Sequence, residues 1–221
     1  MKLYHGSKYI IEQPVFGDGN PRNDYGLAFY CTENIEMAKE WAVSEDCNGF
    51  ANEYEFGADG LKELNLLDEK YNILNWLAIL LENRIFRSNS ELAEEGKRYI
   101  LDNFLPEYRE YDYIKGYRAD DSYFSFANLF ISNGLSLDKL KEAMRLGRLG
   151  EQIAVKSKRA FENLKFTDAH ESPRNIYYIK KKKRDYKARS AFKAMKSDVK
   201  TGIFLIDIMR EGWNNDDLRL R

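Results

Sequence analysis

The chain has 221 residues, 43% of them hydrophobic and 32% charged, and its formal net charge is −1 at pH 7. These values are typical of a soluble globular protein with one domain, or one domain with an extension. No apolar run reaches the ~20 residues of a membrane span, and no signal-peptide pattern precedes the first strand-like run, so we expect a cytoplasmic protein. Two cysteines and two histidines at wide spacing exclude a disulfide framework and a zinc motif, and we expect no bound metal.

The first third of the chain contains two short strand-like runs and a helix. Residues 2–5 and 27–31 are predicted strands, and residues 8–24 between them are predicted loop because they hold two prolines and two glycines. Thr32 or Asn34 can cap a helix that runs to about residue 44. Its apolar positions fall on one helical face.

The middle of the chain is rich in predicted helices. Strong helical periodicity over 76–85 is followed by a second helix at about 91–104. The other predicted elements are a strand over 50–56, a short apolar run over 61–66, an aromatic and mixed segment over 111–117, helices over 121–131 and 136–147, a strand over 152–156, a short helix capped by Ser157 that runs to residue 164, a partly helical basic segment over 175–196 and a last apolar run over 201–209. Strands come early and late with helices between them, which predicts an α+β fold.

The charge is unevenly distributed along the chain. Residues 171–221 contain 14 Lys/Arg and 7 Asp/Glu, whereas residues 1–170 contain 21 and 29. A basic arm with an acidic partner and a basic arm packed on the acidic body both fit this asymmetry. The run Lys180–Arg184 is flanked by tyrosines and fits either a solvated helix face or nucleic-acid contacts through phosphates and stacking.

Two N-terminal segments carry the clearest motifs. The first is Leu3-Tyr4-His5-Gly6-Ser7, in which the glycine lets a ligand approach the backbone. The second is Gly26-Leu27-Ala28-Phe29-Tyr30, followed eleven positions later by Trp41. These segments resemble the first two motif strands of the ADP-ribosyltransferases, in the His–Tyr–Glu branch that includes the poly-ADP-ribose polymerases and diphtheria toxin. More narrowly, the whole chain resembles the bacterial DUF3990 family, including Asp207–Glu211 near its end.

The ADP-ribosyltransferase resemblance implies a split, strongly bent sheet with NAD+ in a cleft. It implies that His5 holds the adenosine-side ribose, which a neutral imidazole can do by hydrogen bonding. It also implies that Gly6 and Ser7 anchor the nicotinamide carboxamide. Tyr30 and Trp41 would then stack on the cationic nicotinamide ring, since aromatic faces attract a flat cation.

Some of these positions have a second interpretation. Tyr30 and Trp41 also fit as core aromatics, because Trp41 lies on the apolar face of the predicted helix. Ala38 stands where the polymerases commonly have a serine that binds the carboxamide. Thr32 is a candidate to replace that contact.

The third triad position falls in Gly150-Glu151-Gln152-Ile153-Ala154-Val155. Cleavage of NAD+ passes through an oxocarbenium-like state, which a carboxylate at the ribose 2′-hydroxyl stabilises. Glu151 fits by direct overlay. Because neighbours on a strand face opposite ways, a shift of one residue would turn Gln152 into the cleft, where it binds the hydroxyl without supplying charge. Both residues are candidate catalytic residues.

Two polar sites elsewhere have a functional and a structural interpretation. Asp120 and Asp121 are adjacent carboxylates. In the functional interpretation they face the cleft, and one of them acts as a base on the acceptor. In the structural interpretation one of them caps the following helix. Arg84 ends an apolar helix and would grip the NAD+ pyrophosphate, or pair with a structural carboxylate.

The family resemblance therefore implies a mono-ADP-ribosyltransferase, a glycosyltransferase that uses NAD+ as co-substrate and modifies a macromolecular acceptor, either protein or nucleic acid. The alternatives are an NAD+ glycohydrolase and a module that binds NAD+ or ADP-ribose with little catalysis. Resemblance to small bacterial transferases also allows a toxin role with a neutralising antitoxin partner. We expect a catalytic domain over 1–168 and a basic extension over 169–221 packed on the same domain.

Overall fold

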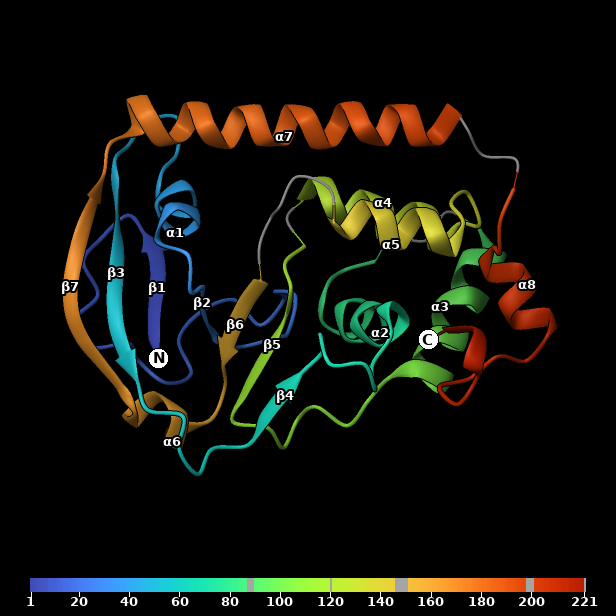
Figure 1. The fold of residues 1–221 in the computed structure, drawn as a ribbon, viewed down its shortest axis with the longest axis horizontal. Helices are drawn as coiled ribbons and strands as arrows, with labels where there is room; N and C mark the ends of the chain where they lie inside the picture. Colours follow the sequence, from blue (N-terminus) through green and yellow to red (C-terminus); the bar gives the residue numbers. More distant parts are fainter. Residues whose placement is uncertain (87–89, 120, 146–150, 198–200, 221) are drawn as a thin grey trace.

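The computed structural model of the chain describes residues 1–86, 90–119, 121–145, 151–197 and 201–220. Its helices and two β-sheets confirm the predicted α+β class (Figure 1). The strands are β1 (Lys2–Ser7), β2 (Phe29–Cys31), β3 (Gly49–Phe56), β4 (Glu63–Asn65), β5 (Tyr113–Tyr117), β6 (Glu151–Val155) and β7 (Leu164–Ser172). The helices are α1 (Ile35–Ala42), α2 (Ile73–Asn83), α3 (Glu91–Phe104), α4 (Asp121–Ile131), α5 (Leu137–Arg145), α6 (Lys158–Glu162), α7 (Arg174–Ser197) and α8 (Leu205–Arg210), with a 3-10 turn over Leu218–Leu220.

The two sheets meet where β1 passes β2. One sheet is antiparallel with the order β1-β3-β7, and the other has the order β2-β6-β5-β4, in which β4 and β5 run parallel. An isolated bridge joins Tyr4 to Thr32, with backbone N···O distances of 2.8 and 2.9 Å. Next to this bridge, His5 of β1 and Tyr30 of β2 face a common space.

Helix α1 packs closely on β1 because of a glycine. Asn34 caps the helix, and its side chain accepts hydrogen bonds from two backbone N–H groups of the first turn. A Cβ atom at Gly6 would lie 2.1 Å from the carbonyl oxygen of Ala38 and 2.8 Å from the backbone nitrogen of Ala42. The missing side chain at position 6 therefore lets the helix backbone lie directly against the strand.

The larger core surrounds α2, in which residues 73–81 are all buried. A helix that is apolar on all sides is typical of a fully enclosed element. The same core includes Ile100 of α3, Phe130 of α4 and Ile208 of α8, each 0% exposed. This core lies beside the second sheet and forms the helical half of the molecule (Figure 1).

Helix α7 runs along one side of the molecule and spans both halves (Figure 1). It contacts both α1 and α4. Tyr177 and Ala188 on its inner side are buried. The helix carries ten Lys/Arg residues and one Asp. In the described part of the chain, no helix combines the length and the apolar character needed to cross a membrane.

Strand β7 was not predicted from the sequence. Most of its side chains are exposed or half-buried, so its pattern carries little apolar alternation. Its backbone pairs with β3 from Gly49–Ser172 to Phe56–Leu164, and this long-range pairing stabilises the strand. The expected domain boundary at 168/169 falls inside β7, so the C-terminal extension begins within the first sheet and continues into α7.

Candidate functional site

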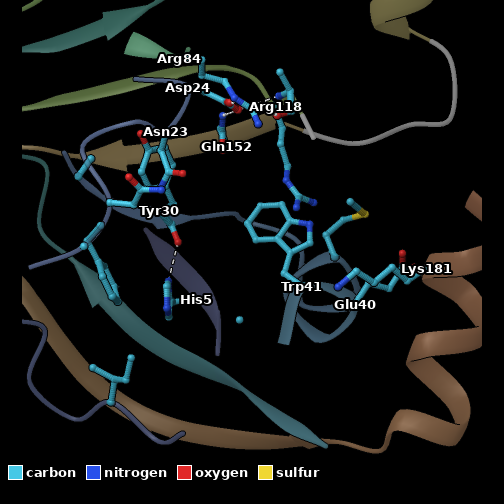
Figure 2. Close-up of a pocket in the computed structure, with 18 of the residues that line it drawn as sticks. His5, Asn23, Asp24, Tyr30, Glu40, Trp41, Arg84, Arg118, Gln152 and Lys181 are labelled. Atoms are coloured by element: carbon cyan, nitrogen blue, oxygen red, sulfur yellow. Dashed lines mark hydrogen bonds and ion pairs between the residues drawn. The ribbon is translucent and has the colours of Figure 1, made fainter. Parts of the chain in front are cut away.

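A cleft of about 740 Å³ is lined by residues of β1, the loop before β2, β2, α1, β6 and α7 (Figure 2). This volume lies in the range of small-molecule sites, about 300–1,000 Å³. Of the residues predicted to bind or react, the cleft brings together His5, Gly6, Tyr30, Trp41 and Gln152. They come from four elements that are up to 147 residues apart in the sequence.

His5 is oriented by a backbone carbonyl. Its Nδ1 lies 2.7 Å from the oxygen of Tyr30, and because a carbonyl only accepts, Nδ1 carries the hydrogen (Figure 2). Desolvation lowers the pKa of His5, and the hydrogen bond to Tyr30 opposes this shift only in part. The ring also stacks on Phe29, with centroids 4.2 Å apart. A neutral imidazole in this position has Nε2 as an acceptor for a ligand hydroxyl.

Tyr30 is fixed through its own hydroxyl. The hydroxyl donates to the carbonyl oxygen of Gly26 at 2.6 Å and accepts from the backbone N–H of Tyr25 at 3.0 Å. Gly26 has φ +79°, a left-handed conformation that glycine adopts readily. Burial raises the pKa of Tyr30, so the phenol is neutral and its ring presents an uncharged aromatic surface to the cleft.

Trp41 forms part of the α1 side of the cleft and is half-buried. Its Nε1 is buried, and no described residue accepts a hydrogen bond from it. The guanidinium carbon of Arg118 lies 4.3 Å from the centroid of the indole (Figure 2). Trp41 therefore already binds one flat cation, supplied by the protein itself, through a cation–π contact.

Strand β6 places Gln152 in the cleft and Glu151 outside it. Gln152 is 3% exposed, and its Nε2 donates to Asp24 Oδ2 at 2.8 Å and to the carbonyl oxygen of Tyr117 at 3.2 Å. Glu151 is exposed and forms an ion pair with Lys115 at 3.1 Å. The pleat of the strand turns these neighbours to opposite faces. Of the two registers considered from the sequence, the structure has the one that turns Gln152 inward.

Asp24 is a cleft residue that the sequence analysis missed. It is 7% exposed, and its Oδ2 accepts hydrogen bonds from Gln152 and from the backbone N–H of Ala119 at 2.8 Å. Its Oδ1 lies 3.4 Å from an Nη atom of Arg84. Burial raises the pKa of Asp24, while these donors and the nearby Arg84 and Arg118 charges oppose that shift. Its partners Ala119, Arg84 and Gln152 come from distant parts of the sequence, so nothing local distinguishes this aspartate from other loop acids.

The Asp24 contact also fixes the amide of Gln152. A carboxylate and a carbonyl both accept, so the nitrogen of the amide must face them. Both hydrogens of Nε2 are then used, and Oε1 of Gln152 is the atom that can accept a hydrogen bond from a ligand. The pair therefore presents one acceptor and one adjacent negative charge to the cleft.

Ser7 and Thr32 lie near the cleft, but their hydroxyls contact the protein. Ser7 Oγ donates to the carbonyl oxygen of Tyr9 at 2.5 Å and accepts from Asn52 Nδ2 at 2.9 Å. Thr32 is 2% exposed, and its Oγ1 accepts from the backbone N–H of Asn34 at 3.2 Å. Neither Ser7 nor Thr32 is among the described residues that line the cleft.

The remaining polar candidates have different positions. Asp120 lies outside the described residues, as does the side chain of Asp121, which is the first residue of α4. Arg84 lines the cleft and donates to the carbonyl oxygen of Ala119 at 2.7 Å, in addition to its contact with Asp24. Arg84 thus makes the structural ion pair considered from the sequence while remaining at the cleft wall.

Helix α7 forms the basic side of the cleft. Arg184 binds both carboxylate oxygens of Glu40, at 2.9 and 2.8 Å. Lys181 donates to the carbonyl oxygen of Val43 at 2.9 Å. Part of the basic run therefore packs on α1, as one of the two interpretations of the charge asymmetry predicted.

The family model "Protein of unknown function (DUF3990)" matches residues 1–166. The chain belongs to the DUF3990 family. This match confirms the resemblance to the DUF3990 family that was noted from the sequence. The matched segment includes all of the predicted site residues, but it ends before α7 and before residues 207–211. No curated protein and no solved structure matched the chain.

Proposed function

We propose that this DUF3990 protein is a mono-ADP-ribosyltransferase that binds NAD+ in the cleft. The observation that carries the proposal is the convergence of His5, Tyr30, Trp41 and Gln152 on one cleft of suitable size. A core role alone would not require a histidine, a glutamine and two aromatic rings to share a solvent-connected space. The ADP-ribosyltransferase resemblance of β1 and β2 then gives each of these residues a role.

In this proposal the cleft holds NAD+ at three points. His5 accepts a hydrogen bond from the adenosine-side ribose through Nε2. The backbone of Gly6 binds the nicotinamide carboxamide. Tyr30 and Trp41 provide aromatic surfaces for the nicotinamide ring, a contact worth ~1–2 kcal/mol when it is desolvated. Because Arg118 lies over the Trp41 ring, it would have to move aside or stack on the far face of the indole.

The reaction breaks the bond between C1′ of the ribose and the nicotinamide nitrogen. Nicotinamide leaves with the bonding electrons, and the ribose becomes oxocarbenium-like. Gln152 Oε1 accepts a hydrogen bond from the ribose 2′-hydroxyl, and the neighbouring Asp24 supplies the negative charge that a glutamine lacks. A nucleophile of the acceptor then bonds to C1′ and releases its proton, which a carboxylate with a raised pKa can take up.

Labelled NAD+ incubated with the purified protein and a cell extract tests the proposal. We expect label on a macromolecule. Free ADP-ribose as the main product would instead indicate a glycohydrolase, and saturable binding without turnover would indicate a binding module, which the amide at position 152 favours.

Two substitutions on β6 test the assigned geometry. We expect Gln152→Ala to lower turnover by roughly 10- to 100-fold, because it removes a contact to the reacting ribose. Glu151→Ala should change turnover less than about twofold, because its carboxylate pairs with Lys115 outside the cleft. The opposite pattern would reject Gln152 as the cleft residue.

A further inference from the structure

Helix α7 concentrates positive charge beside the cleft. Its 24 residues include ten Lys/Arg and one Asp, whereas the whole chain has a net charge of −1. At 1.5 Å per residue the helix is about 36 Å long. A charge of this density over such a length attracts polyanions.

Only part of this charge serves the packing of the helix. Lys180 forms an ion pair with Glu36 at 2.7 Å, and Arg184 binds Glu40. The hydroxyl of Tyr177 also hydrogen-bonds to Glu36 at 3.0 Å. These contacts lie on the side of α7 that faces α1, and the described basic residues on the rest of the helix surface do not take part in them.

The side of α7 that does not face α1 carries a row of basic residues with one tyrosine among them. Lys182, Tyr186, Arg189 and Lys193 lie at positions i, i+4, i+7 and i+11, which share one helical face over about 16 Å. We call these four, together with the adjacent Lys183 and Lys187, the α7 row. In the described part of the chain, Lys183, Lys187 and Lys193 are exposed and make no ion pair, whereas Arg189 pairs with Asp185 at 2.9 Å.

The α7 row reaches the cleft. Lys182 and Arg189 line the cleft as well as belonging to the row. Tyr186, between them in the row, is 72% exposed, which is unusual for so large an aromatic side chain. A ligand that follows the row therefore passes the place where we propose that NAD+ reacts.

We propose that the α7 row binds a single-stranded nucleic acid and that a nucleotide of this strand is the ADP-ribose acceptor. Lys and Arg contact phosphates, and an exposed tyrosine ring among them provides a surface for base stacking. An acidic protein surface would use the charges but would give the exposed ring of Tyr186 no role. This inference rests on the proposed function.

The transfer step balances without a further reactant. The bond between C1′ and the nicotinamide nitrogen of NAD+ breaks, and a bond forms between C1′ and a nitrogen or oxygen of the nucleotide. Nicotinamide and one proton are released.

Binding is tested first, without NAD+, by fluorescence anisotropy of labelled single strands of DNA and RNA, about 12 nucleotides long, between about 50 and about 300 mM NaCl. The variant Lys183→Gln/Lys187→Gln/Lys193→Gln should bind roughly 10- to 100-fold more weakly at about 0.1 M salt. Its salt dependence should fall by about 2 in log–log slope, because each single-strand phosphate contact contributes about 0.7. Tyr186→Ala should weaken binding roughly tenfold.

The matched control replaces three exposed lysines away from α7. Lys62→Gln/Lys158→Gln/Lys165→Gln makes the same change of charge at α6 and at the adjoining starts of β4 and β7, on the opposite side of the molecule (Figure 1). It should leave the affinity within about twofold, since contacts beyond the Debye length of ~10 Å are screened. Equal losses in both triple variants, or no binding by the wild type, would overturn the α7 row as the site. Poly-glutamate is added as a competitor with the same total negative charge as the strand. If it displaces the strand, the ligand of the α7 row is an acidic protein surface instead.

Transfer is tested second, with labelled NAD+ and the unlabelled strands. We expect the wild-type protein to label the strand. The variant Lys183→Gln/Lys187→Gln/Lys193→Gln should label it much less. Label on extract proteins but not on strands would overturn the acceptor class and leave the transferase proposal standing. Strand binding through the α7 row without any consumption of NAD+ would overturn the transferase proposal, and the acceptor role with it.

Discussion

The two sides of the cleft are built in different ways. On one side His5, Gly6 and Trp41 come from the first 41 residues, and α1 and β1 pack with their backbones in contact. On the other side Asp24 and Gln152 come from segments 128 residues apart and are joined by a hydrogen bond between buried polar groups. The first side depends on steric fit, so a change there should affect folding. The second depends on charge and hydrogen bonding, so a change there should affect chemistry more than the fold.

Gly6→Ala tests the steric side and should have the largest effect. The new Cβ would lie 2.1 Å from one backbone atom and 2.8 Å from another, and neither can move without shifting α1. Overpacking usually lowers stability by about 1–3 kcal/mol, and we expect about 3 kcal/mol or more here. Urea denaturation measures the loss. Gly57→Ala is the matched control, because a Cβ there meets no atom within 4 Å. A Gly6→Ala protein as stable as the wild type would contradict the close packing of α1 on β1.

Asp24→Asn tests the polar side. It keeps the shape of the side chain but removes the charge next to Gln152, and we expect kcat to fall roughly 100-fold or more with a smaller change in KM. The acid limb of the wild-type pH profile should lie above the ordinary aspartate pKa, because burial raises the pKa of Asp24. Asp59→Asn, at an exposed position, serves as the control.

A reversed pair sharpens the same experiment. Asp24→Asn combined with Gln152→Glu moves the carboxylate to the neighbouring side chain. Recovery of part of the lost rate would show that the cleft needs a charge at this place. No recovery, together with an unchanged melting curve, would show that Asp24 holds Gln152 in position rather than supplying charge.

The pH dependence of stability gives the smallest predicted effect. The folded pKa of His5 lies below its ordinary value of 6.5, so the unfolded chain binds a proton that the folded protein does not. Stability should therefore fall as the pH drops below 6.5, until it reaches the lowered pKa of the folded state. We expect His5→Gln to lose less stability than the wild-type protein when urea denaturation is compared at pH 7.5 and at about 5.5. The same loss in both proteins would place His5 in a more hydrated site.

Local patterns predicted the elements whose causes are local. The helix over 91–104 was predicted at the bounds that α3 has. Ser157 caps a helix as predicted, and of the two candidates Thr32 and Asn34 the cap of α1 is Asn34. Long-range contacts decided the rest. Strand β7 depends on pairing with β3, and the orientation of Gln152 depends on the register of β6 in its sheet. Asp24 was missed because its partners, Gln152, Ala119 and Arg84, come together only in the folded chain.

The place where β7 passes into α7 has a practical consequence for shortened versions of this protein. The family match ends at residue 166, inside β7. A protein cut there would leave most of one edge of β3 unpaired, and an unpaired strand edge promotes aggregation. It would also lack the helix that closes one side of the cleft. Expression of a soluble fragment should therefore require the chain to continue at least through Ser197.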